Sequence, residues 1–163
     1  MQLFNRRWHV RLLALLHERK GARFVVMKQA LGMNADSLSR SLEELMAAGW
    51  VQRNPGYGHP LRPEYILTKE GQDLARYCSL FDALVAELGV TSVIYRKWSV
   101  PTLLGINEGA TRFNELRDSL VITPRALSQS LDSLCAVDLV RQDAGYGTTD
   151  NGSAIAKRAA QLT

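Results

Sequence analysis

The chain contains an internal repeat, because a segment near its start recurs eighty-nine positions later in the same order. The first copy runs from Arg23-Phe24 to Gly56-Tyr57-Gly58, and the second runs from Arg112-Phe113 to Gly145-Tyr146-Gly147. A repeat of this kind predicts that each copy is one structural unit with its own core. The 163 residues have room for two domains of roughly 80 to 90 residues, which we place at 1–89 and 90–163 and expect to be related by a pseudo-two-fold axis.

The composition is that of an ordinary globular chain with a small excess of positive charge. Hydrophobic residues make up 46% and charged residues 22%, which excludes a long disordered tail. The net charge of +4 and the pI near 9.3 favour a polyanionic partner such as nucleic acid without requiring one. Twelve basic and nine acidic residues precede Val90, against eight and seven after it, so the first copy carries most of the positive excess.

The sequence contains neither a membrane span nor a metal-binding motif. No run reaches the ~18 apolar residues of a span, and the apolar run Leu12–Leu16 is too short for a signal peptide. We therefore expect a cytoplasmic protein that does not bind membranes. The cysteines and histidines lack metal-ligand spacing, which predicts no metal and no cofactor. Cys78 and Cys135 are expected to be small buried hydrophobic residues; the alternative is a redox switch, which needs an exposed thiol with a lowered pKa.

Apolar spacing predicts three helices in the first copy. The first contains Trp8 and ends at Gly21, the second spans Phe24–Leu31, and the third spans Ala35–Ala48 with Asn34 as its N-cap. The short turn between the last two is typical of a helix-turn-helix, whose second helix enters a groove of DNA. Leucines face the core, so the outward face of this third helix carries Asp36, Arg40, Glu43 and Glu44, flanked by Ser37 and Ser39.

A β-hairpin is predicted after the third helix. Its strands, Trp50–Asn54 and Glu64–Leu67, flank a loop rich in glycine and proline. Beside a helix-turn-helix such a hairpin is a wing that lies along the phosphate backbone, and here it carries Arg53, His59 and Arg62. Thr68 then caps a long connecting helix within 69–89, predicted as Lys69–Leu88, whose apolar face consists of Leu74, Tyr77, Cys78, Phe81, Leu84, Val85 and Leu88.

The second copy predicts the same order of elements. One helix spans Ser92–Ile106, a second spans Arg112–Leu120, and Thr123-Pro124 opens a third that extends to Ala136. The outward face of that third helix carries Arg125, Ser128, Gln129, Asp132 and Ser133.

The second wing is shorter than the first. Nine residues separate Gly58 from Thr68, but only Thr148 separates Gly147 from Thr149. We therefore expect a hairpin that has lost eight residues, with almost no return strand, and that cannot reach the DNA backbone as the first can.

The two copies together resemble the HxlR family of bacterial winged-helix transcriptional regulators, which is related to the MarR group. The second copy carries the N-terminal part of the family pattern, as Lys97-Trp98-Ser99-Val100-Pro101-Thr102-Leu103-Leu104, Arg112-Phe113-Asn114-Glu115-Leu116 and Leu127-Ser128. The first copy carries the C-terminal part, as Gly49-Trp50-Val51-Gln52-Arg53, His59-Pro60 through Glu64-Tyr65, and Leu67-Thr68-Lys69-Glu70-Gly71. The resemblance implies a mainly α fold with small β-hairpins, a tandem winged helix-turn-helix of the α+β class.

Family members usually carry one such domain and dimerise through their terminal helices. By this resemblance, the chain is similar to two protomers fused into one, with the helices Lys69–Leu88 and Ser92–Ile106 as the interface. This implies a monomeric pseudo-dimer rather than a homodimer.

The function that these features favour is sequence-specific binding of double-stranded DNA by a transcription regulator without catalytic activity. The third helices would enter successive major grooves about 34 Å apart. The residues expected to read bases or contact phosphates on these helices are Ser37, Ser39, Arg40, Arg125, Ser128 and Gln129, since arginine and glutamine make bidentate contacts with guanine and adenine. Arg53, His59 and Arg62 are expected to contact phosphates, and the fold leaves room for a small-molecule effector.

Some charged residues allow more than one role. Glu43 and Glu44 oppose deep insertion, so we expect them beyond the groove, paired with Arg40. Arg23 and Arg112 each open a helix and either pack against neighbouring structure or contact phosphate. The alternative function is a protein-interaction adaptor, which the modest net charge and the short second wing favour. No glycine-rich phosphate loop, paired nucleophile and base, or acidic metal cluster suggests an enzyme.

Overall fold

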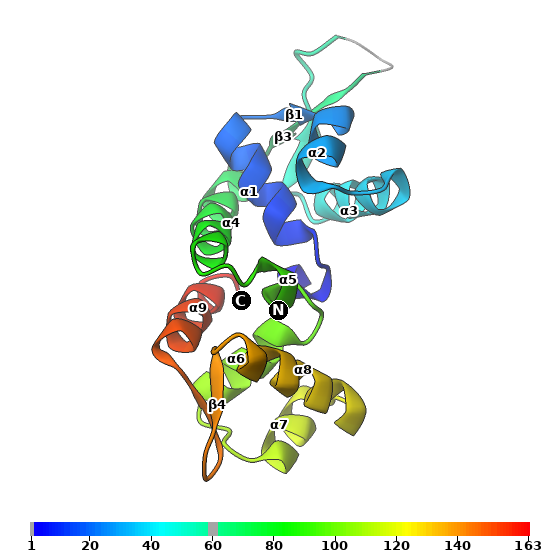
Figure 1. The fold of residues 1–163 in the computed structure, drawn as a ribbon. Coiled ribbons are helices and arrows are strands. Elements are labelled where there is room, and N and C mark those ends of the chain that lie inside the picture. Colours follow the sequence, from blue (N-terminus) through cyan, green and yellow to red (C-terminus); the bar gives the residue numbers. More distant parts are fainter. Residues whose placement is uncertain (1, 59–61) are drawn as a thin grey trace. The chain divides into compact units, whose positions relative to one another are not determined.

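The computed structural model describes residues 2–58 and 62–163 and is mainly helical, with two small antiparallel sheets (Figure 1). Its contacts divide the chain into two compact units. The N-terminal unit spans Trp8–Asp82, and the C-terminal unit combines Ala83–Thr163 with the segment up to Arg7. Each unit contains a helix-turn-helix followed by a β-hairpin, so the predicted fold class is confirmed.

The N-terminal unit consists of three helices, a three-stranded sheet and the first part of a long helix. Its elements are α1 (His9–Arg19), β1 (Ala22–Arg23), α2 (Phe24–Leu31), α3 (Ala35–Ala47), β2 (Val51–Arg53), β3 (Glu64–Leu67) and α4 (Lys69–Glu87). The predicted α2 and β3 have the observed bounds, and the predicted ends of α3 and α4 each lie one residue too far along the chain. The short strand β1 was not predicted.

Local signals explain the bounds of the helix-turn-helix. Gly32 ends α2 in the left-handed conformation, at φ 62°, which glycine adopts without a steric cost. The Asn34 side chain then accepts a 2.8 Å hydrogen bond from the backbone N–H of Ser37 and caps α3. Leu38, Leu42 and Leu45 are buried, so the opposite face of α3 is left to solvent.

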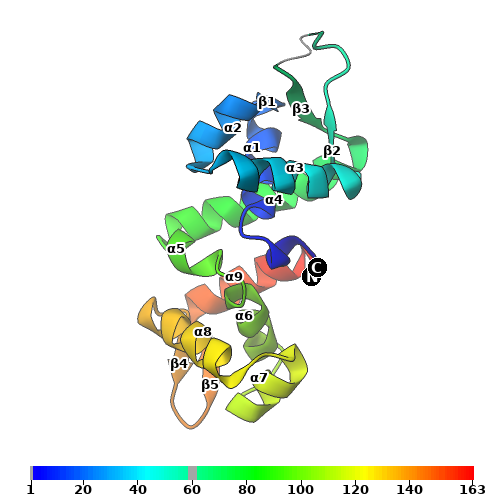
Figure 2. The same cartoon turned by 90° about the vertical axis from the view of Figure 1, so that its right-hand side faces the viewer.

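The first wing is built on the sheet, whose strand order is β1-β3-β2. Val51 pairs with Leu67 and Arg53 pairs with Tyr65. At the base of the loop, the Asn54 side-chain amide donates to Glu64 Oε2 at 2.6 Å, and the Asn54 backbone N–H donates to the Glu64 carbonyl at 2.8 Å. The described residues of the loop that follow Asn54, up to Gly58, project beyond α2 and α3 in both views (Figures 1 and 2).

The C-terminal unit repeats this arrangement, and its last helix follows the second hairpin as α4 follows the first. Its elements are the 3-10 helix η1 (Gln2–Asn5), α5 (Thr91–Ile94), α6 (Ser99–Asn107), α7 (Phe113–Leu120), α8 (Pro124–Ala136), β4 (Val140–Gln142), β5 (Tyr146–Thr148) and α9 (Asp150–Ala160). No prediction covered α9, whose buried face consists of Gly152, Ile155, Ala156 and Ala159.

The prediction of one helix over Ser92–Ile106 is wrong, because α5 ends at Ile94 and α6 begins at Ser99. Pro101 explains the break, since proline has no N–H and its ring clashes with the carbonyl four residues earlier inside a helix. In the first turn of α6 neither cost arises. The Ser99 hydroxyl donates to the Val93 carbonyl at 2.7 Å and holds the two helices at this corner.

The prediction that the second wing has almost no return strand is also wrong. Strand β5 pairs with β4 over its whole length, from Val140 opposite Thr148 to Gln142 opposite Tyr146. The Gly-Tyr-Gly sequence, which lies in the loop of the first wing, supplies the end of the turn and the return strand in the second. The second wing is therefore a complete but short hairpin (Figure 2).

The same hydroxyl contact closes both wings. The Thr68 hydroxyl donates to the Gly49 carbonyl at 2.6 Å, and the Thr149 hydroxyl donates to the Asp138 carbonyl at 2.7 Å. Each hydroxyl also accepts a hydrogen bond from a glycine N–H in the first turn of the helix that follows. The difference of eight residues between the two copies thus lies entirely within the wings.

A glycine on each helix makes this closure possible. A Cβ at Gly71 would overlap the Trp50 carbonyl oxygen, and a Cβ at Gly152 would overlap the Leu139 carbonyl oxygen. Any other residue at these two positions would push the helix away from the end of the wing. We call each of these threonine–glycine contacts, Thr68 with Gly71 and Thr149 with Gly152, a wing joint.

The predicted apolar face of α4 is only partly buried. Cys78 and Phe81 are buried, but Tyr77 is 41% exposed. Tyr77 lies at the edge of the apolar stripe at helical spacing, where an aromatic ring covers its neighbours and its hydroxyl reaches water. The predicted apolar face therefore includes a residue that is exposed at its edge.

Candidate nucleic-acid interface

The exposed face of α3 carries most of the predicted N-terminal site. Ser39 and Arg40 are exposed, whereas Ser37 is half-buried and its backbone N–H is bonded to Asn34. Asp36 and Glu43 share this face and are exposed as well. The surface of α3 therefore presents one arginine among hydroxyl and carboxylate groups, with the leucines behind it fixing its orientation.

The exposed face of α8 carries the predicted C-terminal site. Arg125, Ser128 and Gln129 are all exposed. Thr123 caps the helix through its hydroxyl, which accepts from the Ala126 N–H at 3.4 Å, and Pro124 occupies the first helical position. Leu127, Leu131 and Leu134 are buried behind this face.

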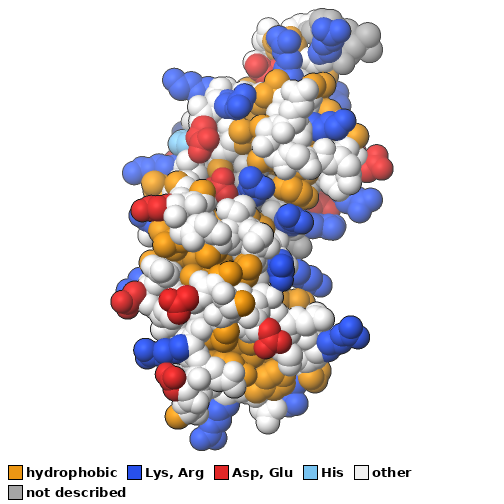
Figure 3. All heavy atoms as spheres, in the orientation of Figure 1, with side chains coloured by type: hydrophobic (Ala, Val, Ile, Leu, Met, Phe, Trp, Pro, Cys, Tyr) orange, Lys and Arg blue, Asp and Glu red, His pale blue; other side chains and the backbone are white. Residues whose placement is uncertain are grey.

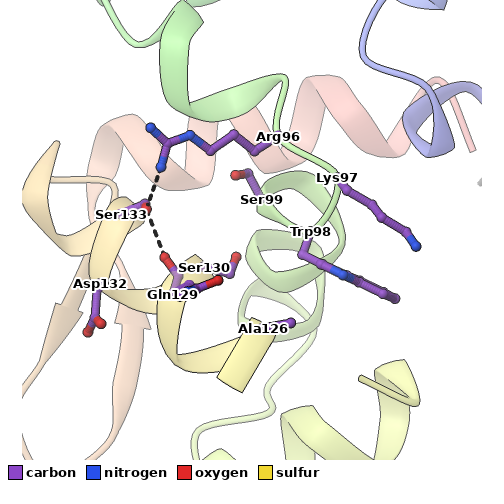
Figure 4. A pocket seen from close by; sticks show the side chains of 9 residues that line it. All are labelled: Arg96, Lys97, Trp98, Ser99, Ala126, Gln129, Ser130, Asp132 and Ser133. Carbon is purple, nitrogen blue, oxygen red and sulfur yellow. Dashed lines mark hydrogen bonds between the residues drawn. The ribbon is translucent and has the colours of Figure 1, made fainter. Parts of the chain in front are cut away.

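A side-chain contact behind each exposed face ties the helix to an earlier segment of its unit, α1 in the N-terminal unit and the turn between α5 and α6 in the C-terminal unit. In the N-terminal unit His9 Nε2 lies 3.0 Å from Glu44 Oε2. In the C-terminal unit Arg96 Nη1 donates to Ser133 Oγ at 2.8 Å (Figure 4). Glu44 and Ser133 hold equivalent positions in the repeat, so the two units fix α3 and α8 at the same point with different chemistry. The expected contact of Glu44 with Arg40 is corrected to one with His9.

A pocket of about 530 Å³ lies between the start of α6 and α8. Lys97 Nζ lies 5.0 Å from the centroid of the Trp98 ring, within the range of a cation–π contact. The volume of the pocket falls within the range of small-molecule sites. The lining residues are Arg96, Lys97, Trp98, Ser99, Ala126, Gln129, Ser130, Asp132 and Ser133 (Figure 4). Sequence reasoning did not identify Arg96 and Lys97 as neighbours of the α8 face, because both were placed inside the predicted helix Ser92–Ile106.

The two wings carry different basic residues. Arg53 at the end of β2 and Arg62 in the loop are exposed, while His59 lies outside the described residues. The short wing carries Arg141, which was not predicted and whose Nε lies 3.7 Å from Asp143 Oδ2. The first wing therefore exposes both arginines that are predicted to bind phosphate. The second wing has one exposed arginine, which lies beside a carboxylate.

Arg23 and Arg112, which each precede a helix, make different contacts in the structure. The guanidinium of Arg23 lies 4.8 Å from the centroid of the Tyr57 ring, so Arg23 packs on the first wing. The backbone N–H of Arg112 donates to Glu115 Oε2 at 3.0 Å, and its side chain is exposed. A phosphate contact by Arg112 stays a prediction.

Charge is mixed on the visible face of each unit. Lys and Arg side chains lie among Asp and Glu side chains and do not merge into one basic patch (Figure 3). Binding of a polyanion on this face would therefore depend on the placement of single cations more than on a broad positive field.

The cysteines do not have the properties of a redox switch. Burial, and secondarily the charge of Asp82, raise the pKa of the Cys78 thiol from its usual 9.0 to about 12. Burial and the charge of Asp132 also raise the pKa of Cys135. Reactive thiols have lowered pKa values. Cys78 is buried as predicted, whereas Cys135 is only half-buried.

Residues 2–58 and 62–163 contain neither a membrane-spanning helix nor a cluster of metal-ligating side chains. No helix there combines the length and the apolar character needed to cross a bilayer. Within the same residues, no three His, Cys, Asp or Glu side chains gather where they could hold a metal ion.

The comparisons with known proteins identify a family. The sequence model of the HxlR-like helix-turn-helix family matches the chain twice, over residues 3–89 and 93–157. No curated protein and no solved structure matches the chain. The two matches cover most of the sequence and confirm the predicted resemblance. The chain therefore belongs to the HxlR-like helix-turn-helix family of DNA-binding transcription regulators, and it carries the family domain twice.

Proposed function

We propose that the chain is a sequence-specific transcription regulator in which two halves of one polypeptide replace the two protomers of a dimer. The observation that carries this proposal is the pair of exposed helix faces, on α3 and α8, each backed by buried leucines within a helix-turn-helix. We retain 1–89 and 90–163 as the proposed division between the halves. One chain would then occupy one operator.

Each of these reading helices would enter a major groove of the same duplex. Arg40, Arg125 and Gln129 would make the contacts that distinguish bases, with the serines Ser37, Ser39 and Ser128 beside them. Arg53, Arg62 and His59 would contact phosphates, which fixes the position of the protein on DNA without selecting a sequence. The exposure of Arg53 and Arg62 on the wing supports this assignment.

Covalent linkage would make the second contact intramolecular once the first has formed. Two linked modules bind more tightly than either alone by a factor of roughly 10² to 10⁴ when both can engage. A substitution that weakens the DNA contacts of one of these helices should therefore lower the affinity by more than the loss of a single contact. The chain would also lose the gain in affinity that comes from binding at two points.

Selection of bound fragments from a random pool of duplex DNA tests the proposal. We expect enrichment of one site, followed by a loss of affinity in the double variant Arg125→Ala with Gln129→Ala. Arg76→Ala is the matched control, because Arg76 is an exposed arginine on α4, outside the helix-turn-helix. Sedimentation of the complex should give one chain per duplex. Two chains per duplex would contradict the pseudo-dimer, and no enrichment would contradict DNA binding itself.

The second candidate function is a protein-interaction adaptor that docks a partner through the winged helices. The carboxylates of Asp36 and Glu43 on the α3 face favour it, because they repel phosphate. An adaptor would bind heparin and random duplex DNA weakly, with little dependence on salt. A steep salt dependence of binding would exclude this candidate.

A further inference from the structure

We infer that α3 and α8 read different DNA sequences, so that the operator consists of two unlike half-sites. This inference rests on the proposed function, and it concerns the sequence that each half would recognise. It is carried by a comparison of equivalent positions on two helices that are held in the same way.

The two helices can be compared residue by residue because their frameworks match. Each begins after a capping side chain, Asn34 or Thr123, that accepts from the backbone N–H three residues later. Their buried leucines recur at the same offset of eighty-nine positions, as Leu38, Leu42 and Leu45 in α3 and Leu127, Leu131 and Leu134 in α8. Equivalent exposed positions therefore point to the same side of each helix-turn-helix.

The exposed side chains at these positions differ in charge and in hydrogen-bonding groups. Asp36 is equivalent to Arg125, and Arg40 is equivalent to Gln129. In the major groove, arginine pairs with guanine, glutamine pairs with adenine, and aspartate accepts from the amino group of cytosine. The chemistry of α8 favours guanine and adenine, whereas that of α3 favours cytosine and guanine. Ser39 and Ser128 are alike and would not distinguish the half-sites.

Arg125 lies in the first turn of α8, where the positive end of the helix dipole makes a cation unfavourable. Its charge therefore does not stabilise the start of the helix, and this favours a role in binding. Asp36, by contrast, interacts well with the dipole at the start of α3. For that reason the second experiment below changes Asp36 together with Arg40, and does not rely on Asp36 alone.

The wings add a second asymmetry. The first wing presents Arg53 at the end of β2 and Arg62 in its long loop, whereas the short wing presents Arg141 close to Asp143. Phosphate contacts would then be stronger beside the half-site that α3 reads, and base selection would contribute more beside the half-site that α8 reads.

Selection from random duplex DNA with the unmodified chain is the first experiment. We expect a single site whose two halves differ in sequence. Two identical half-sites, in either orientation, would overturn the inference and leave the DNA-binding proposal intact. Failure to enrich any site would overturn both.

The second experiment uses the double variant Asp36→Arg with Arg40→Gln, which gives α3 the base-contacting groups of α8. Both positions are exposed, so the fold is expected to persist, and circular dichroism and thermal unfolding would verify it. Selection with this variant should return two copies of the α8 half-site. Affinity for the original operator should fall by about 5- to 150-fold for each lost bidentate contact. An unchanged selected sequence would overturn the inference.

The matched control is the double variant Lys69→Arg with Gln72→Asn, which alters two exposed residues of α4 and leaves both reading faces unchanged. Its selected sequence should equal that of the unmodified chain. A shift in the control as large as that in the α3 variant would overturn the assignment of base reading to Asp36 and Arg40.

Discussion

Val121 holds the turn between α7 and α8 in the left-handed conformation that Gly32 adopts between α2 and α3, with φ angles of 51° and 62°. The two residues are equivalent in the repeat. Val121 is also 88% exposed, so no burial of its side chain offsets the backbone cost. A β-branched residue in this conformation is strained.

Replacing Val121→Gly should therefore stabilise the C-terminal unit by about 1 kcal/mol, because the relieved strain exceeds the added freedom of the unfolded chain. The reciprocal Gly32→Val should destabilise the N-terminal unit by about 1–2 kcal/mol, since nothing lies within 4 Å of its Cβ and only the backbone term applies. Urea unfolding measures both changes. Equal stability of Val121→Gly and the unmodified chain would contradict the strain.

Substitutions at the wing joints should be far more damaging. Gly71→Ala and Gly152→Ala each place a methyl group against a backbone carbonyl oxygen, so we expect a loss of about 2–3 kcal/mol in the free energy of unfolding. The control is Gly58→Ala, where nothing lies within 4 Å of the added Cβ and no positive φ is required. Thermal unfolding of the three variants would reveal the difference, and a Gly71→Ala variant as stable as the control would contradict the close approach.

The arginines of the first wing should set the salt dependence of DNA binding. Arg53→Ala and Arg62→Ala should each weaken binding to every sequence and make the plot of log K against log salt shallower by about 0.9 for each lost phosphate contact. Fluorescence anisotropy over a series of salt concentrations measures the slope, with Arg76→Ala as the control. An unchanged slope in both wing variants would show that this wing does not contact phosphate.

Cys78 should make the protein less stable at alkaline pH. Its thiol keeps its proton up to about pH 12 in the folded chain, whereas the unfolded chain releases it near 9.0. The unfolded state therefore binds fewer protons between these values, and stability falls as pH rises, by up to about 1.4 kcal/mol per pH unit from this group. Urea unfolding between pH 8 and 10.5 should show a shallower decline for Cys78→Ala. Parallel declines would contradict the raised pKa.

Local signals in the sequence predicted the helix-turn-helix segments well. Leucine spacing, the caps Asn34 and Thr123, and Gly32 determine the bounds of α2, α3 and α8 through contacts within a few residues. The same periodicity predicted the exposure of Arg40, Arg125 and Gln129. Each of these features depends on the geometry of one helix and needs no knowledge of distant parts of the chain.

Features that depend on distant partners were missed or misassigned. Strand β1 has two residues and exists only because it pairs with β3. The two Gly-Tyr-Gly sequences were treated as equivalent because their residues are identical. The strand pairing shows that the first lies in a loop, whereas the second forms the end of a turn and part of a strand. The contacts His9–Glu44 and Arg96–Ser133 join segments more than thirty residues apart, and no local pattern predicts them.

The hairpin that each wing joint closes is free to vary in length. Because the same threonine and glycine contacts close a long hairpin in one half and a short one in the other, insertion or deletion in the hairpin does not disturb the helices on either side. Evolution, or a protein engineer, can therefore lengthen, shorten or exchange the hairpin as a unit. Under the proposed function, such a change would alter the phosphate contacts and leave the residues that read bases unchanged.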